Sequence, residues 1–362
     1  MTTTRDIIDS ANEAFVSMDS TGAIVDWNPA AERIFGWSRD EALGMSLSDT
    51  IIPMELRAAH REGLSRFLAT GQGPILNRRI QVPAVNRLGD GFPIELTISS
   101  AQRGSDWLFH AFIHDISERR RNERYLETQF AVTTLLAESD SIADTLPNLL
   151  RILCRGLGWK LGSYWDLDPS DHKLRCMSQW HIDGLPAGDF VTMSQDLVLS
   201  GTEGLPGRVA ESGEPAWVDD VRSDEGFPRA TTAASAGLGA ALALPVLYQG
   251  ETLGVLEFFS DRIQAPDDAL IEMMRTVSSQ IGQYVVRKRT EHRLLELRAL
   301  QLNDDILQGL VVAKMALELG EHDDSLRALE ATIIAARRIV SELVQDSESG
   351  VRTGSFVRHP PK

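Results

Sequence analysis

Apolar residues recur at helical spacing over the last quarter of the 362-residue chain. One run extends from about Pro266 to Gly320 and a second from Ser325 to Val344, with a turn at 321–324 between them. Side chains three or four residues apart lie on one face of a helix, so each run predicts a helix with an apolar stripe. The pattern therefore predicts a helical hairpin, and two hairpins would bury both stripes in a four-helix bundle.

Shorter apolar runs alternate with turn residues between residues 6 and 115. Five of them predict strands, at 14–19, 23–27, 77–86, 92–101 and 107–115. Short helices are predicted between the second and third strands, where Asn28 suits an N-cap and Pro29 a first helical position. This segment is predicted to be a small antiparallel sheet with helices.

A comparable domain is predicted further along the chain. Its expected elements are a helix at 143–155 and strands at 160–167, 174–181, 240–248 and 252–260. The segment 183–200 is rich in loop residues, and the glycines of 204–209 are interpreted as turn positions. The helix predicted at 116–136 carries alternating arginine and glutamate residues, which is typical of a solvated helix with ion pairs along its surface.

The first domain resembles the PAS family over about residues 5–120. The resemblance is carried by Trp-Asn-Pro-Ala-Ala-Glu at 27–32, Phe-Gly-Trp-Ser at 35–38, Glu-Ala-Leu-Gly at 41–44, Gly-Asp-Gly-Phe-Pro-Ile-Glu-Leu at 89–96 and Asp-Ile-Ser-Glu-Arg at 115–119. It implies an antiparallel sheet and helices that enclose a ligand pocket, followed by an output helix.

The second domain resembles the GAF family over about residues 128–288. The matching segments are Gly-Leu-Pro-Gly-Arg-Val at 204–209, Ala-Leu-Ala-Leu-Pro-Val at 241–246, Tyr-Gln-Gly-Glu at 248–251 and Gly-Val-Leu-Glu-Phe-Phe at 254–259. This family also encloses a pocket between a sheet and helices. No phosphate-binding motif of the Gly-Lys-Ser/Thr type is present.

The predicted fold class is α+β: two antiparallel-sheet sensor domains, PAS then GAF, joined by long helices and followed by a C-terminal helical hairpin. The expected boundaries are PAS at 1–116, a linker helix at 117–136, GAF at 137–288, the hairpin at 289–346 and a disordered tail at 347–362.

Charge and composition exclude several functional classes. The net charge is −16, whereas a nucleic-acid-binding surface needs a basic face. Two cysteines, Cys154 and Cys176, are too few for a disulfide framework or a multi-cysteine zinc site. No apolar run is long enough for a membrane span and no signal pattern opens the chain, so we expect a cytoplasmic protein.

The hairpin resembles the dimerisation and phosphotransfer module of NarX/DesK-like histidine kinases over about residues 292–345. Members of that family carry the motif His-Asp-x-x-x-Gln on their first helix, and this chain has Asn303-Asp304-x-x-x-Gln308. An amide nitrogen is not the nucleophile that an imidazole is. Because Asn303 takes the phosphoacceptor position, and because no Gly-rich ATP-binding domain follows, we expect no autophosphorylation.

Dephosphorylation of a partner remains open. The resemblance implies that Gln308 would orient a water at a partner's phospho-aspartate, with Asp304 beside it, and positioning a water requires no nucleophile on this chain. The alternative is a docking and dimerisation bundle without catalysis. The sequence thus leaves enzyme activity undecided, between none and a residual phosphatase.

The positions of His60 and Arg66 also resemble those of two haem-contacting residues in the oxygen-sensing haem PAS domains. In those domains a histidine at the position of His60 is the axial iron ligand and an arginine at that of Arg66 meets a propionate; a neutral imidazole suits haem iron. They also carry a distal arginine on the following strand, where this chain has Ile80. A surface or capping role for His60 is the alternative, and no other metal site is predicted.

Taken together, these patterns predict a homodimeric sensor that binds a small ligand in its PAS or GAF domain, or in both. Its helical spine would pass the signal to a response regulator or histidine kinase. The rival hypotheses are a phospho-aspartate phosphatase using Gln308 and a haem gas or redox sensor using His60.

Overall fold

The computed structural model describes residues 4–104, 106–224, 226–263, 266–319 and 322–352, with side chains up to Arg338. The chain divides into two compact units, Met1–Glu123 and Arg124–Lys362.

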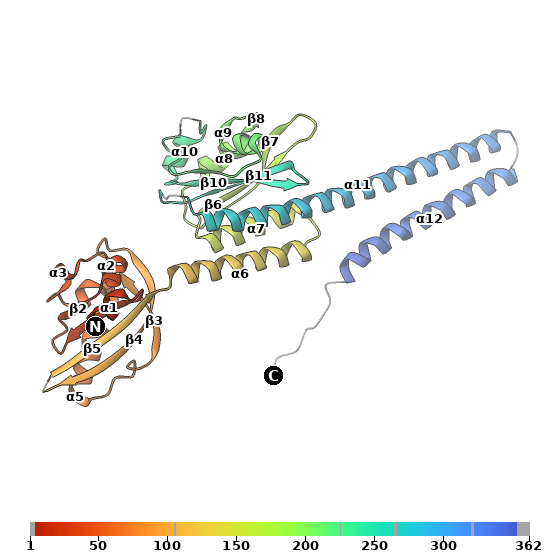
Figure 1. Cartoon of the computed structure of the whole chain (residues 1–362). Helices are drawn as coiled ribbons and strands as arrows, with labels where there is room; N and C mark the ends of the chain where they lie inside the picture. Colours follow the sequence, from red (N-terminus) through yellow and green to blue (C-terminus); the bar gives the residue numbers. More distant parts are fainter. Residues whose placement is uncertain (1–3, 105, 225, 264–265, 320–321, 353–362) are drawn as a thin grey trace. The chain divides into compact units, whose positions relative to one another are not determined.

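The first unit is built on a five-stranded antiparallel sheet in the order β2-β1-β5-β4-β3 (Figure 1). Its strands are β1 (Ala14–Asp19), β2 (Ile24–Trp27), β3 (Arg79–Val85), β4 (Gly91–Arg103) and β5 (Asp106–Asp115). Its helices are α1 (Thr4–Ser10), α2 (Pro29–Phe35), α3 (Arg39–Ala42), α4 (Leu47–Thr50), a 3₁₀ turn at Met54–Leu56 and α5 (Arg57–Thr70).

Asn28 organises the start of this unit. Its side-chain oxygen accepts a hydrogen bond from the backbone of Ala31, which caps α2, and another from Phe15 on β1. Its amide nitrogen donates to the carbonyls of Ile8 and Glu13. A fully buried amide with all these partners stabilises the fold because no polar atom is left without a partner.

The second unit contains a six-stranded antiparallel sheet in the order β8-β7-β6-β11-β10-β9. Its strands are β6 (Leu161–Leu167), β7 (Lys173–His181), β8 (Val198–Ser200), β9 (Ala216–Val218), β10 (Ala241–Tyr248) and β11 (Glu251–Phe259). Its helices are the later part of α6 (Ser117–Glu138), then α7 (Ile142–Leu157), α8 (Gly188–Asp196), α9 (Gly204–Ser212), α10 (Ala230–Ser235), α11 (Asp268–Glu318) and α12 (His322–Arg352).

Two hydrophobic layers lie on the opposite faces of this sheet. Side chains of α6, α7 and α11 pack on one face against Leu242 and Leu244 of β10. Side chains of α8, α9 and the segment around α10 pack on the other face, where β10 presents the small residues Ala241 and Ala243. Alternate residues of a strand point to opposite faces, so β10 presents bulky residues to the long helices and small ones to the other layer.

Glycines mark the closest approaches of the long helices. A Cβ on Gly282 of α11 would lie 2.1 Å from the carbonyl oxygen of Leu247, and one on Gly309 would lie 1.8 Å from Oγ1 of Thr332 on α12. The two glycines therefore let α11 pack tightly on β10 at one end and on α12 at the other.

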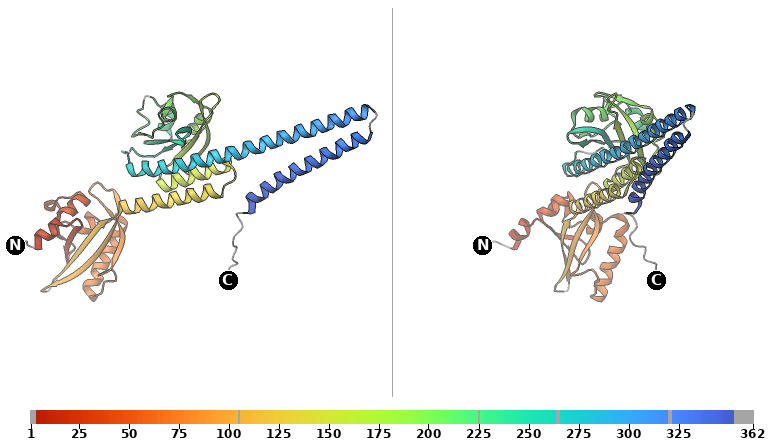
Figure 2. Two further views of the ribbon diagram at one scale, coloured as in Figure 1. Left: turned by 45° about the vertical axis from the view of Figure 1, so that its right-hand side comes forward. Right: turned by 90° about the vertical axis from the view of Figure 1, so that its right-hand side faces the viewer.

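The last two helices form the predicted hairpin (Figure 2). Ser325 of α12 donates a hydrogen bond of 2.8 Å to the carbonyl of Ala313, and Ala313 and Ala316 are buried between the helices. The prediction of an α+β chain with two antiparallel sheets and a long C-terminal helix pair is confirmed.

Three local predictions were wrong. The segment 183–200 contains α8 and β8 rather than loops. Residues 204–209 begin α9, and of their two glycines only Gly204, with a φ of 64°, has the predicted turn geometry. Gly207 is a contact position, because a Cβ there would meet the carbonyl oxygen of Gly201 at 2.7 Å. Residues 347–352 of the predicted tail continue α12, since extending a formed helix is easier than starting one and no proline interrupts it. The rest of that tail lies outside the described residues.

Candidate functional site

The three residues of the degenerate kinase motif lie on α11. Asn303, Asp304 and Gln308 are all exposed, and within the described part of the chain their side chains make no hydrogen bond or ion pair. The α12-facing side of α11 carries Gly309 and Ala313. At about 100° per residue, Asp304 lies on the opposite side from Ala313.

An exposed heptad pattern runs along the side of α11 that faces away from α12. Its members alternate in steps of three and four residues, the spacing of a two-helix seam. We call this set the α11 seam: Ser279, Gln283, Val286, Thr290, Arg293, Leu297, Leu300, Asp304, Leu307 and Val311. Its four apolar members beyond Thr290 are 52–62% exposed, which is unusual for large apolar side chains that recur so regularly.

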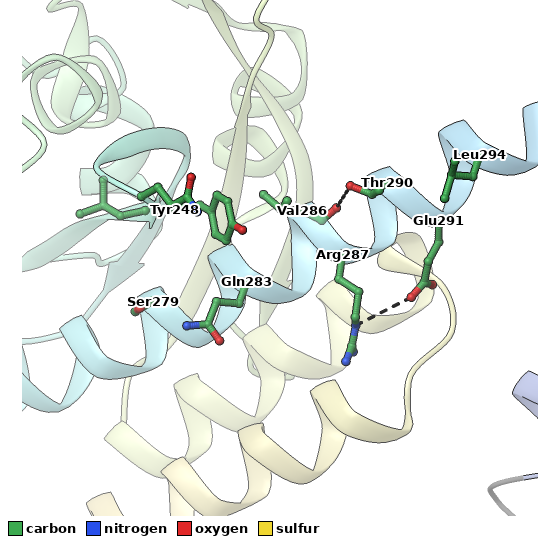
Figure 3. A pocket seen from close by; sticks show the side chains of 10 residues that line it. Tyr248, Ser279, Gln283, Val286, Arg287, Thr290, Glu291 and Leu294 are labelled. Carbon is green, nitrogen blue, oxygen red and sulfur yellow. Dashed lines mark hydrogen bonds and ion pairs between the residues drawn. The ribbon is translucent and has the colours of Figure 1, made fainter. Parts of the chain in front are cut away.

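Two open grooves follow the first half of this seam. The larger has a volume of about 740 Å³ and lies between the β10–β11 turn and α11, with Tyr248 on one wall and Gln283, Val286 and Thr290 on the other (Figure 3). The second, about 250 Å³, continues along α11 past Thr290 to Leu297. The grooves and the exposed apolar residues thus form one continuous strip.

Polar contacts tie the start of this strip to the sheet and to α6. Arg289 of α11 forms a hydrogen-bonded ion pair with Asp166 of β6, and Tyr164 donates to the same carboxylate oxygen at 3.0 Å. Burial raises the pKa of Asp166 above its ordinary value, and the neighbouring Arg289 opposes that shift. On the other side, Arg287 donates to the carbonyl of Leu136 at 3.0 Å.

The first unit holds a cavity of about 200 Å³ beside α5. Both haem candidates line it, His60 half-buried and Arg66 exposed. The Nδ1 atom of His60 is buried without a hydrogen-bond partner. Burial, together with the positive charge of Arg61, lowers the pKa of His60, so its imidazole is held in the neutral form.

This cavity does not fit a haem in the conformation described. Its volume is below the range of about 300–1,000 Å³ that is usual for drug-sized ligands, and a macrocycle needs more room than that. Its walls include Phe67, Leu76 and Phe109, which would have to move. Arg79 on β3 pairs with Glu95 at 3.4 Å, and Ile80 is not among the lining residues. The donor chemistry of His60 is suitable, whereas the space is that of a much smaller ligand.

The cysteines offer no reactive centre. Cys154 and Cys176 are free thiols. Burial raises the pKa of both, that of Cys176 to about 12, so both are protonated at neutral pH. Within the described ranges, no group of three or more His, Cys, Asp or Glu side chains is placed to hold a metal ion, and none of the helices has the length and apolar content to cross a bilayer.

The second unit contains a buried ion pair that was not predicted from the sequence. Arg229, just before α10, and Glu257 of β11 are 1% and 0% exposed and lie 2.6 Å apart. Both residues lie in or next to segments that carry the resemblance to the GAF family. An arginine between apolar residues and a glutamate within an apolar strand were the available signals.

Comparison with known proteins identifies the two folded units. Residues 3–116 match the family model of the PAS fold, and residues 139–286 match that of the GAF domain. The chain carries a PAS domain followed by a GAF domain. The cavity beside His60 therefore lies in the PAS domain, and the Arg229–Glu257 pair lies in the GAF domain.

Individual relatives resemble parts of the chain. An uncharacterized protein from Azorhizobium caulinodans is 42% identical over 123 residues, which are 34% of this chain and 17% of that protein. The sensor protein FixL of Bradyrhizobium diazoefficiens is 31% identical over 123 residues, 34% of this chain and 24% of that protein. The chain thus matches about a quarter or less of the length of these curated relatives. A GAF-domain structure of a Coxiella burnetii phosphoenolpyruvate-protein phosphotransferase, 19% identical, covers 47% of this chain and 98% of that one, with a TM-score of 0.41.

Proposed function

We propose that this protein is a cytoplasmic, homodimeric signal-transduction sensor. A small ligand binds in the PAS domain, the GAF domain or both, and α11 carries the change to the hairpin. The hairpin then docks on a signalling partner, a response regulator or a histidine kinase. The match to a PAS and a GAF domain supports the sensory role, and two unpaired cysteines are in keeping with a reducing compartment.

The α11 seam carries this proposal. It starts on the GAF domain, where Ser279 and Gln283 line the larger groove, and continues to Val311 in the hairpin. Exposed leucines at heptad positions are stabilised when a second helix covers them. A second copy of α11 would fill both grooves and bury Leu297, Leu300 and Leu307.

The contacts at Asp166 and Leu136 suggest how a signal would enter the seam. Arg289 attaches α11 to β6, and Arg287 attaches it to α6, within one turn of the seam residue Thr290. A ligand that shifts β6 would change the balance between these two attachments. Two packings of the dimeric helices with different ligand affinities would then differ in population.

Disulfide cross-linking tests the dimer and its orientation. Thr290→Cys places a thiol in the seam, and the matched control His292→Cys places one two residues further, about 200° around the helix. We expect rapid intermolecular cross-linking of the Thr290 variant and little for the control, because opposed seam residues meet in a parallel dimer. A monomer by sedimentation, or equal cross-linking of both variants, would refute the proposed interface.

The exposed pair Gln308 and Asp304 keeps a phosphatase as a second candidate function. Both side chains are exposed in the single chain, and Gln308 lies beside the seam, where it can still meet a partner's phospho-aspartate in the dimer. Asn303 cannot accept a phosphoryl group as histidine does. The test is the decay of a phosphorylated partner receiver with this protein, with Gln308→Ala and with Gln301→Ala as the matched exposed control. An effect of Gln308→Ala alone would support catalysis. If Gln308→Ala leaves the decay rate of the phosphorylated receiver unchanged, the hairpin is a docking surface without catalysis.

The PAS cavity supports a small ligand better than haem. An apolar wall with one neutral imidazole, at His60, suits a compact molecule that accepts or donates one hydrogen bond. An absorption spectrum of the purified protein after haem loading separates the two cases. A Soret band that is lost in His60→Ala would establish the haem alternative and would show that the cavity expands.

A further inference from the structure

Arg229 places a full positive charge inside the GAF domain. Its Nη2 donates to Oε1 of Glu257 at 2.6 Å, and its Nη1 donates to Oγ of Ser194 at 2.9 Å. The other carboxylate oxygen of Glu257 accepts from Nε1 of Trp165 at 3.0 Å. The Nε of Arg229 is buried without a hydrogen-bond partner, so the site satisfies this guanidinium incompletely.

Aromatic rings surround the same guanidinium. Its central carbon lies 4.8 Å from the ring centre of Phe190, 4.9 Å from Phe227, 5.0 Å from Trp165 and 5.8 Å from Phe259. Ring faces attract cations within about 6 Å, and aromatic cages of this kind hold quaternary ammonium and methylated lysine groups in other proteins. The arrangement is that of a cation bound in a receptor.

Stability alone does not account for this arrangement. Replacing a buried ion pair by apolar residues of similar volume is often neutral or stabilising, because both charges lose their hydration. On this side of the sheet β10 contributes the small residues Ala241 and Ala243, whereas its opposite face carries leucines. The guanidinium fills the space between the aromatic rings and this layer, and we call that space the chamber.

The occupant and the receptor belong to different parts of the domain. Trp165, Glu257 and Phe259 lie on the central strands β6 and β11, and Phe190 lies on α8. Arg229 lies outside the sheet, at the start of the short helix α10. If the segment that carries Arg229 moves away, three aromatic rings and an unpaired carboxylate remain.

We propose that this chamber of the GAF domain is a binding site for a small molecule that bears a guanidinium or alkylammonium group, and that Arg229 is its intramolecular occupant until the ligand displaces it. The ligand's cation takes the place of the guanidinium between the rings and pairs with Glu257. The inference rests on the proposed sensory function and names the ligand class of its GAF domain.

Chemical rescue of the full chain tests the receptor. Arg229→Ala empties the chamber and leaves Glu257 unpaired, so we expect a lower melting temperature. Ethylguanidinium at millimolar concentration should restore it saturably, whereas equal concentrations of sodium chloride or urea should not. In Arg229→Ala/Glu257→Gln the affinity for ethylguanidinium should fall at least about tenfold, because the charge partner is gone. The control Arg222→Ala removes an exposed arginine that pairs with Asp220, and it should not respond.

Absence of saturable rescue overturns the proposal. If Arg229→Ala does not fold by itself, it is refolded with and without ethylguanidinium, and equal recovery of secondary structure refutes the site in the same way.

The wild-type chain tests the displacement. In the wild type, ethylguanidinium must compete with the side chain of Arg229. Its apparent affinity should therefore be weaker than in Arg229→Ala, in proportion to the fraction of molecules in which Arg229 has left the chamber. Agmatine, which carries a guanidinium and an ammonium group, should accelerate hydrogen exchange at 226–238 as that segment leaves the chamber. Unchanged exchange at saturating agmatine shows that Arg229 is a permanent core residue and refutes the displacement. Cross-linking of Thr290→Cys in the same preparations reports the dimer independently, so failure here is distinguishable from failure of the sensor proposal.

Discussion

Arg289 in the middle of α11 and Asp166 of β6 form an ion pair that joins this helix to the centre of the GAF sheet. The side chains are 37% and 27% exposed, and Tyr164 donates to the same carboxylate. The pair is therefore partly shielded from water, and it lies where α11 leaves the domain.

We expect a measurable coupling between these two residues. In a double-mutant cycle of Asp166→Asn and Arg289→Gln, the interaction should amount to about 0.5–1 kcal/mol, the upper part of the range for exposed pairs. The measurement is the urea midpoint followed by tryptophan fluorescence. The control pair is Asp168 with Arg175, each 41% exposed, for which a smaller coupling is expected. Equal couplings in both cycles would contradict the structural role given to Asp166.

The seam predicts opposite effects of two substitutions on self-association. Leu307→Glu adds a charge to an apolar seam position and should weaken the dimer at least tenfold, about 1.4 kcal/mol. Asp304→Leu removes a carboxylate from the seam and should strengthen it. Sedimentation equilibrium measures both dissociation constants, with Gln301→Glu on the flank of α11 as the charge control. A dissociation constant that is unchanged by Leu307→Glu would exclude the α11 seam as the dimer interface.

Helical glycines with and without a close neighbour should respond to alanine substitution with stability changes of opposite sign. Gly282→Ala places a methyl group 2.1 Å from the carbonyl oxygen of Leu247, and such overpacking costs about 1–3 kcal/mol. Gly63→Ala, inside α5, meets no atom within 4 Å and should stabilise the PAS domain by up to about 1 kcal/mol through helix propensity. Thermal unfolding of both variants tests the difference. Destabilisation by the Gly63 substitution would show that its surroundings are tighter than described.

His60 predicts a pH dependence of PAS stability. Its folded-state pKa lies below the ordinary value of 6.5 because burial disfavours the charged ring. A depressed pKa contributes stability that is present above the unfolded pKa and is lost as the pH falls through the folded value. The melting temperature of the wild type should therefore fall more between about pH 7.5 and 5.5 than that of His60→Gln. The exposed His114→Gln should behave like the wild type, and identical profiles for all three proteins would contradict the prediction.

The order of most helices and strands was predictable from the sequence. Apolar residues recur with a period of about 3.6 in helices and of two in strands, and turn residues separate these segments. Nine of the eleven strands in the described part of the chain lie within two residues of their predicted ends, as at 161–167 and 241–248, whereas the three-residue strands β8 and β9 were not predicted. Segment 183–200 was missed because α8 is short and weakly amphipathic, so its loop composition outweighed its helical spacing.

Side-chain positions in the candidate sites were less predictable. Gly282 and Gly309 weaken a helix by local propensity, and only the approach of β10 and α12 explains them. Nor does a pattern along the chain reveal that Arg229 lies against Glu257, because these residues are 28 positions apart and belong to different elements. The roles of Asn303, Gln308 and His60 stay predictions that the proposed experiments decide.

The alternation of side chains along β10 has a consequence for redesigning this receptor. Residues 241 and 243 lie in the layer that contains the chamber around Arg229, whereas residues 242 and 244 face the helices that lead to the hairpin. In the proposed sensor, neighbouring residues of this one strand would therefore contribute separately to ligand recognition and to signal output. Enlarging or reshaping the odd-numbered positions would retune specificity for a new cation while the output surface keeps its packing.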